Sequence, residues 1–257
     1  MARVLVLAGT TEATELAGRL TTEGHDVTSS LAGVTRHPVE RPGRVRRGGF
    51  GGTDGLARYL TEEAVEQLVD ATHPFAAVMP FHAAEAAAST GVAHCRLLRP
   101  PWTPLAGDHW HHTATLAAAA EALPALGAER VFLALGRQSL QPFAGSSGLW
   151  FLVRAIEPLD AVLPDAEVVL DRGPFDVDEE VALLTRHRVD TVVTKNAGGP
   201  AAEAKLVAAR RLGLPVVMVD RPPQPVAETV ATVSDAVAWC QARTRSGTRP
   251  SPGDRGV

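Results

Sequence analysis

The chain has 257 residues, of which 45% are hydrophobic and 21% are charged, and this length suits one large domain or two modest ones. Its formal net charge of −4 gives no general attraction to nucleic acid or to an anionic membrane, and no apolar run is long enough to span a bilayer. The two cysteines, Cys95 and Cys240, exclude a disulfide framework and a cysteine-rich zinc site. No signal peptide precedes the first predicted strand, so we expect a cytoplasmic protein.

Strands and helices alternate along the first hundred residues. The apolar run at residues 3–8, ended by Gly9, is typical of a strand buried on both faces of a parallel sheet. Thr10 or Thr11 can cap the helix that follows it. Further strands are predicted at 27–31, 68–71 and 94–98, and further helices at 55–67 and 79–89. This alternation indicates a doubly wound parallel sheet.

A proline-rich linker at residues 99–108 separates this part from a second series of elements. Strands are predicted at 130–135, 149–154, 167–170, 190–194 and 215–219, and helices at 199–212 and 234–243, the last capped by Ser234. We therefore predict one domain at 1–100 and another at 109–243. Residues 244–257 are rich in Arg, Ser, Gly and Pro, and we expect a disordered tail.

The second half repeats short segments of the first half in the same order. The matched segments are Arg3–Thr10 with Arg130–Arg137, Arg47–Phe50 with Arg172–Phe175, Val65–Val69 with Val189–Val193, and Arg99–Pro101 with Arg221–Pro223. The predicted fold is therefore α/β, with two Rossmann-like doubly wound parallel-sheet domains related by an internal duplication. A gap between such halves is where a cofactor and a large substrate can meet.

The loops of the first half suit a dinucleotide. The segment Leu7–Glu12 runs from a strand through Gly9 into a helix, whose free N–H groups can hold a phosphate, although one glycine stands where three are usual and a plain tight turn is the alternative. About twenty residues later, Ser29 and Ser30 occupy the position that meets the adenine ribose. Two hydroxyls with Arg36 nearby favour the 2′-phosphate of NADPH, unless the serines merely end a strand.

Two other loops of this half carry ligand-binding residue types. Gly49 and Gly51 flank Phe50 in a run of four glycines, which lets the backbone approach a ligand while the ring stacks on it; a flexible hinge is the alternative. Thr72 and His73 follow a predicted strand, where they can contact a nicotinamide or a substrate. A structural role for His73 remains the alternative.

The predicted strand ends of the second half carry cations. They are Arg137, Arg154, Arg172 and Lys195, which suit a substrate with several carboxylates. Solvated surface charges are the alternative for Arg154 and Arg172. Lys195 is one of only two lysines and lies in a loop bounded by glycines.

The absence of several known sequence motifs excludes some classes of reaction. Tyr59 is followed by Glu63, so the Tyr-x-x-x-Lys pair of short-chain reductases is absent, and so are Gly-x-Ser-x-Gly and P-loop motifs. His109, His111 and His112 lack residues spaced to complete a metal site, so we expect no metal. The reaction class that remains is hydride transfer to a conjugated, electrophilic bond. Such a reaction depends more on the positioning of the reactants than on a strong acid.

Together these loops resemble the precorrin-6A reductase family of cobalamin biosynthesis. The residues that carry the resemblance are Leu7–Glu12, Ser30–Gly33, Gly48–Gly52, Asp70–Phe75, Arg99–Trp102, Leu135–Gln138, Arg172–Phe175 and Thr194–Gly199. It implies two Rossmann-like domains and an NADPH-dependent oxidoreductase that reduces one double bond of the tetrapyrrole precorrin-6A to give precorrin-6B.

The resemblance also assigns residues. The cofactor residues it implies, together with their neighbours, are Gly9, Thr10, Thr11, Ser29, Ser30, Arg36, Gly49, Phe50, Gly51, Thr72 and His73. The tetrapyrrole carboxylates are assigned to Arg137, Arg154, Arg172, Gly173, Lys195 and Asn196. Val34 stands where relatives often have an arginine, so Arg36 is expected to take over the phosphate contact.

Several alternatives stay open at this point. His73, Lys195 or bound water can deliver the proton that accompanies the hydride. The substrate can be another anionic metabolite, such as the cobalt-containing analogue of precorrin-6A, or the chain can be a non-enzymatic NADP(H)-binding module. We expect a monomer.

Overall fold

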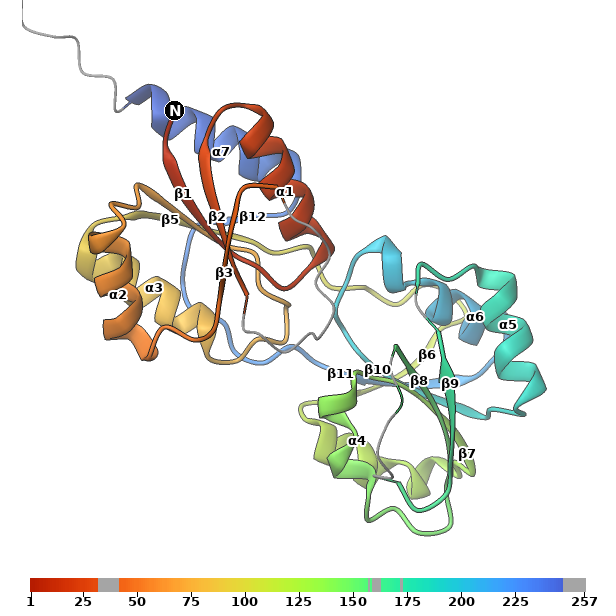
Figure 1. Ribbon diagram of the computed structural model, residues 1–257. Coiled ribbons are helices and arrows are strands. Elements are labelled where there is room, and N and C mark those ends of the chain that lie inside the picture. The colour runs from red at the N-terminus through yellow and green to blue at the C-terminus, as the bar shows by residue number, and fades with distance from the viewer. Residues whose placement is uncertain (32–41, 157, 159–162, 172, 247–257) are drawn as a thin grey trace, which may run out of the picture. The chain divides into compact units, whose positions relative to one another are not determined.

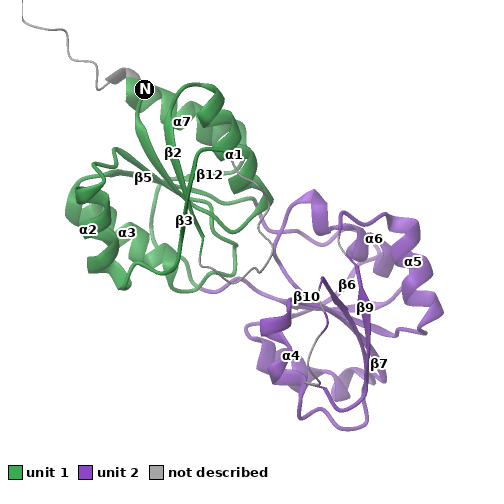
Figure 2. Ribbon diagram, in the orientation of Figure 1, with its two compact units in different colours: residues 1–99, 223–257 green, residues 100–222 purple. Residues whose placement is uncertain are grey.

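Two units, each built on its own parallel sheet, make up the chain (Figure 2). The computed structural model describes residues 1–31, 42–156, 158, 163–171 and 173–246. Unit 1 combines residues 1–99 with the chain from 223 onwards, and unit 2 comprises residues 100–222. Within the described stretches, no helix is both long enough and apolar enough to cross a membrane.

Unit 1 has six parallel strands in the order β12-β5-β4-β1-β2-β3 (Figure 1). Its elements are β1 (Arg3–Leu7), α1 (Thr11–Thr22), β2 (Asp26–Leu31), β3 (Arg44–Arg47), α2 (Gly52–Glu62), β4 (Gln67–Asp70), α3 (Met79–Thr90), β5 (Ala93–Leu97), β12 (Thr229–Val230) and α7 (Val233–Ser246). The order reverses direction between β1 and β4, which is the switch point where ligands gather in such sheets.

The core of unit 1 follows from the alternation of side chains along a strand. Val4 and Val6 of β1 pack with α1 and α7 on one face of the sheet, whereas Leu5 and Leu7 pack with α2 and α3 on the other. Because both faces are covered, β1 is apolar throughout, as the sequence pattern indicates.

Unit 2 has six parallel strands in the order β6-β11-β10-β7-β8-β9. Its elements are β6 (His109–Thr113), α4 (Leu116–Ala122), β7 (Arg130–Ala134), β8 (Trp150–Ala155), β9 (Ala166–Leu170), α5 (Val177–Arg186), β10 (Thr191–Lys195), α6 (Ala204–Leu212) and β11 (Pro215–Val219), with 3-10 turns at 124–126, 137–139, 141–143 and 200–202. Phe132 and Leu152 pack from the sheet against Leu184 of α5 and Leu206 of α6.

The two sheets repeat one plan, which confirms the predicted fold class. β1, β2, β3, β4 and β5 correspond in position to β7, β8, β9, β10 and β11. Only the sixth strand differs. In unit 1 it is β12, which follows unit 2 in the chain, whereas in unit 2 it is β6, which precedes the other five strands.

The predicted second domain is wrong at its C-terminal end. Thr229 of β12 pairs with Arg96 of β5, and Trp239 and Cys240 of α7 lie in the same core as Leu16 of α1. The last strand and helix therefore belong to unit 1, since they cover its edge strand β5 and the apolar face of α1. The sequence pattern shows that a helix forms there and does not show against which sheet it packs.

The ends of α7 also differ from the prediction. Thr232, rather than Ser234, provides the cap, because its Oγ1 accepts a hydrogen bond from Asp235 N at 3.1 Å. The helix continues to Ser246, two residues past the predicted start of the tail. Residues 247–257 of that tail lie outside the described residues.

Candidate cofactor and substrate sites

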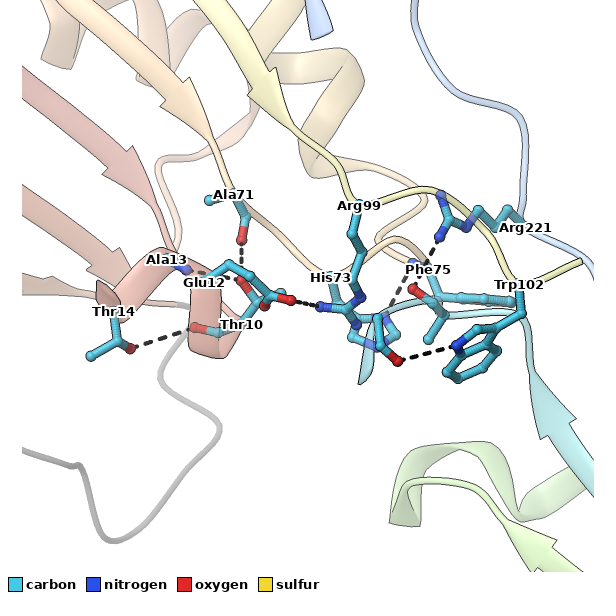
Figure 3. Close-up of polar contacts among 12 residues, drawn as sticks. Thr10, Glu12, Ala13, Thr14, Ala71, His73, Phe75, Arg99, Trp102 and Arg221 are labelled. Carbon is cyan, nitrogen blue, oxygen red and sulfur yellow. Dashed lines mark hydrogen bonds and ion pairs between the residues drawn. The ribbon is translucent and has the colours of Figure 1, made fainter. Parts of the chain in front are cut away.

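The loops after β1 and β4 meet at the carboxyl edge of the unit 1 sheet. Thr10 Oγ1 donates to Ala71 O at 3.1 Å and accepts from Ala13 N at 3.1 Å, so this hydroxyl both caps α1 and ties the helix to the loop after β4 (Figure 3). Thr10 is extended at φ −128°, and the helix begins at Thr11. A Cβ placed on Gly9 would lie 3.7 Å from His73 N. The structure thus brings Gly9, Thr10 and His73 together.

The end of β2 lies beside the same loops. Ala8 N donates to Ser30 O at 2.9 Å, and Ser30 keeps 6% of its surface exposed. Ser29 is fully enclosed, which argues against the predicted contact of its hydroxyl with a cofactor. Arg36 and Val34 lie outside the described residues.

The Gly48–Gly52 loop is held by Arg46, a residue that the sequence reasoning missed. Its guanidinium donates to Gly48 O at 2.5 Å and to Gly49 O at 2.8 Å, and it stacks 3.8 Å from the ring centroid of Phe50. The Phe50 ring also meets Tyr59 edge-on at 5.2 Å. Backbone at φ +84° in Gly51 is the left-handed conformation that glycine adopts without strain. These contacts fix the loop and argue against a plain hinge.

Thr72 and His73 sit on a hydrogen-bonded turn at the end of β4. Asp70 Oδ1 accepts from Thr72 N at 3.0 Å and from Thr72 Oγ1 at 2.7 Å. His73 Nδ1 accepts from Phe75 N at 3.2 Å (Figure 3). A neutral imidazole that accepts at Nδ1 carries its proton on Nε2. The Nδ1 atom of His73 therefore serves as an acceptor within the turn.

An ion pair stands next to this turn and was not predicted. Arg99 Nη1 donates to Glu12 Oε1 at 2.7 Å, and both side chains are partly buried (Figure 3). Together they line a small pocket with Thr10, Thr72, Pro74 and Leu97. Glu12 lies in the first turn of α1, so the arginine offsets a carboxylate placed where the helix dipole favours anions.

In unit 2, Lys195 and the turn after β7 come together at the equivalent edge. Lys195 Nζ, at the end of β10, donates to Ser139 Oγ at 2.7 Å. Burial lowers the pKa of Lys195 from its ordinary 10.5. Arg137 is exposed in the same 3-10 turn as Ser139. Ser139 was not predicted, since an isolated serine two residues past Arg137 gives no signal in a single sequence.

Arg154 is placed differently from its prediction. It forms an ion pair with Glu180 of α5, with side-chain exposures of 12% and 1%, and stacks 3.7 Å from the Phe175 ring centroid. A guanidinium committed to a buried carboxylate is a structural group, which argues against the predicted contact with substrate. Arg172 lies outside the described residues, and the adjacent Gly173 is exposed.

Asn196 also has another role than the predicted one. It is 6% exposed, its Oδ1 accepts from Trp102 N at 2.8 Å, and its Nδ2 donates to Trp102 O at 3.1 Å. Arg221 Nε donates to Asn196 O at 2.9 Å, and a Cβ on Gly198 would lie 2.0 Å from Pro100 O. The loop after Lys195 therefore fastens both segments of unit 2 that lead to unit 1. Its distinctive sequence serves this packing, and a substrate contact by the Asn196 side chain is not supported.

The histidines of β6 were considered as metal ligands in the sequence. His112 Nδ1 lies 2.7 Å from Asp220 Oδ1, which makes a pair. Among the residues that the structure describes, no three His, Cys, Asp or Glu side chains gather in a group that could hold a metal ion.

The strand order and the loops at the carboxyl edges define an α/β protein with two Rossmann-type units. Residues 3–241 match the family model described as precorrin-6x reductase CbiJ/CobK. A precorrin-6A reductase of Rhodococcus erythropolis is 51% identical over 248 residues, covering 95% of this chain and 100% of that protein. The precorrin-6A reductase of Rhodobacter capsulatus is 49% identical over 241 residues, covering 93% and 96%. A solved structure described as CobK precorrin-6A reductase has a TM-score of 0.89 and 47% identity, with both chains fully covered. This chain belongs to the precorrin-6x reductase family and is an oxidoreductase.

Proposed function

We propose that this protein reduces one ring double bond of precorrin-6A with NADPH, giving precorrin-6B in cobalamin biosynthesis. The observation that carries the proposal is the match of residues 3–241 to the family model. Two relatives with 51% and 49% sequence identity to this chain bear the name precorrin-6A reductase. The duplicated fold fits this task, because one unit can hold the dinucleotide while the other supplies cations for a polyanionic ring.

The residues of unit 1 fit a nicotinamide dinucleotide. Gly9, Thr10 and the first turn of α1 from Thr11 would hold the pyrophosphate, since the first N–H groups of a helix lack partners within it. Thr72 and His73 would meet the nicotinamide end, because they share the switch-point edge with Gly9.

The preference for NADPH is supported by the end of β2 and its neighbour β3. No carboxylate follows Ser30 at the strand end, and Arg47 of β3 is paired in register with Leu31. Arg47 is exposed, whereas Arg46 is engaged by the glycine loop. We therefore assign the 2′-phosphate contact to Ser30 and Arg47, and we keep Arg36, which the sequence predicts for the same contact.

NADPH, when bound, supplies the hydride. The protein's part is to orient the ring, to balance its carboxylates and to deliver a proton to the carbon next to the one that receives the hydride. We assign the carboxylates to Arg137 and Arg172, and leave Arg154 out because Glu180 holds it.

We assign the proton to Lys195. Its ammonium is oriented by the hydrogen bond to Ser139 Oγ, and burial lowers its pKa, so the proton is released more readily than from an exposed lysine. After transfer the neutral amine takes a proton back from water. His73 is assigned to the nicotinamide end of the cofactor.

The test is a single-turnover reaction of the purified protein with NADPH and precorrin-6A. Nicotinamide absorbance should fall only when the tetrapyrrole is present, and the product should be heavier than the substrate by two hydrogen atoms. Parallel reactions use the cobalt-containing analogue and a panel of small ketones. If the cobalt-containing analogue or a ketone is turned over faster than precorrin-6A, that compound is the better substrate. If NADPH binds but is not oxidised in any mixture, the proposed reductase activity is contradicted.

A further inference from the structure

A buried ion pair lies directly beneath the turn that carries Thr72 and His73. Arg96 Nε of β5 donates to Asp70 Oδ2 of β4 at 2.8 Å, and the side chains are 2% and 0% exposed. Taking two charges out of water is costly, and an apolar pair of similar size is often as stable or more so. Stability alone therefore does not account for a charged pair at this position.

The duplicated sheet of unit 2 shows what the fold itself needs here. Asp70 pairs with Arg96 in the register of β4 and β5, and Thr194 pairs with Met218 in the register of β10 and β11. Thr194 and Met218 are buried to the same degree, at 2% and 0% exposure. The same layer of the same architecture is thus built without charge, so the fold does not require the ion pair.

What distinguishes Asp70 is its second carboxylate oxygen. While Oδ2 takes the bond from Arg96, Oδ1 accepts both the backbone N–H and the hydroxyl of Thr72, at 3.0 Å and 2.7 Å. The hydroxyl hydrogen of Thr72 is used in that bond. The oxygen of Thr72 is therefore left to act as an acceptor toward a ligand.

We infer that Asp70 and Arg96 are positioning residues for the nicotinamide cofactor. Arg96 fixes the carboxylate of Asp70, the carboxylate fixes the turn, and the turn presents Thr72 Oγ1 as an acceptor for an amide N–H₂ such as that of the nicotinamide carboxamide. This role rests on the proposed function of unit 1. It extends that function to a buried pair that does not itself touch the ligand.

Two double variants separate positioning from packing. Asp70→Val with Arg96→Met removes the acceptor and keeps a β-branched residue opposite a methionine, as unit 2 does with Thr194 and Met218. Asp70→Asn with Arg96→Met restores a side-chain oxygen that can accept from the Thr72 N–H, as asparagine does in turns. The measurements are NADPH affinity by fluorescence titration, hydrogen exchange at the Thr72 amide, and thermal unfolding.

The valine variant is expected to unfold cooperatively near the wild-type temperature, to exchange the Thr72 amide faster, and to bind NADPH about tenfold more weakly. The asparagine variant is expected to recover part of the lost affinity and not all of it, because its amide oxygen can accept from Thr72 but Arg96 no longer holds the side chain in place. In turnover, KM for NADPH should rise in the valine variant while KM for precorrin-6A stays unchanged. Equal NADPH affinity in the valine variant and the wild type overturns the inference, as does an asparagine variant no better than the valine one.

Thr72→Val provides a second route, since it removes the acceptor while leaving the ion pair in place. It should weaken NADPH binding even if the double variants fold poorly, and unchanged affinity overturns the inference. A wild-type protein that does not bind NADPH contradicts the proposed function instead, whereas the effect on Thr72 exchange is measured without any ligand.

Discussion

The side chain of Lys195 is held by a hydrogen bond and has a lowered pKa. Ser139 Oγ orients its ammonium, and burial lowers its pKa below 10.5. An acid must be protonated to act, so kcat should fall as pH rises through the lowered pKa, with a midpoint below 10.5. The pH profile of kcat measures this.

Substitutions complete that test. Lys195→Gln should lower kcat by about a hundredfold and remove the alkaline limb of the profile. Ser139→Ala should lower kcat less and leave KM for NADPH unchanged, because the serine only orients the lysine. An alkaline limb that persists in Lys195→Gln assigns the proton to another group.

The proposed function assigns the 2′-phosphate contact to Arg47, which is exposed and pairs in register with Leu31 at the end of β2. Arg47→Ala should weaken NADPH binding about tenfold, because it removes one charge-assisted contact, and leave NADH binding unchanged. Arg44→Ala is the matched control, since Arg44 lies at the other end of β3 and pairs with Asp26 at 2.8 Å. Titration of each variant with both dinucleotides gives the answer, and equal losses for NADPH and NADH refute the assignment.

At the scale of elements, the ion pair between β8 and α5 supports the fold of unit 2. Glu180→Gln leaves the guanidinium of Arg154 buried without a counter-charge, and should lower the free energy of unfolding by about 3 kcal/mol. The double change Arg154→Met with Glu180→Leu should restore most of that loss. Chemical denaturation measures both. If the double variant is stable yet has a much higher KM for precorrin-6A, Arg154 does contact the substrate.

The elements that the sequence predicted well are those whose side chains repeat with a clear period. β1 and α1 are examples, since Val4 to Leu7 are all apolar and Leu16 and Leu20 share one helix face. The strands β3 and β6 were missed because Arg44–Arg47 and His109–Thr113 are edge strands rich in polar residues. α5 was missed although Asp176 and Glu179 form a capping box readable in the sequence.

Some residues of the candidate site could also be placed from the sequence, whereas the contacts of others could not. Gly9, Thr10, Thr72 and His73 were expected together because the carboxyl ends of neighbouring parallel strands share an edge, and the structure places them so. Arg154 and Asn196 were assigned to substrate because a sequence shows a cation or an amide and not its partner. The pairing of Asp70 with Arg96 depends on the register between two strands 26 residues apart, which no local pattern contains.

At the scale of the whole molecule, the chain leaves unit 1 after residue 99 and returns at residue 223 to complete it. Unit 2 is continuous and holds all six of its strands, whereas residues 1–99 lack β12 and α7. Without α7, the apolar faces of Leu16 and Leu20 on α1 lose Val237 and Trp239, and the edge of β5 is unpaired.

A fragment of residues 100–222 should therefore unfold cooperatively by itself, whereas residues 1–99 should not form a stable fold because apolar surface is exposed on α1. Addition of a peptide of residues 223–246 to the 1–99 fragment should restore helical circular dichroism and a thermal transition. The same peptide with Trp239→Asp should fail, since it places a charge in the core shared with α1. A stable, cooperative 1–99 fragment would show that the returning segment is dispensable, and the first hundred residues would then be the independent domain that the sequence predicts.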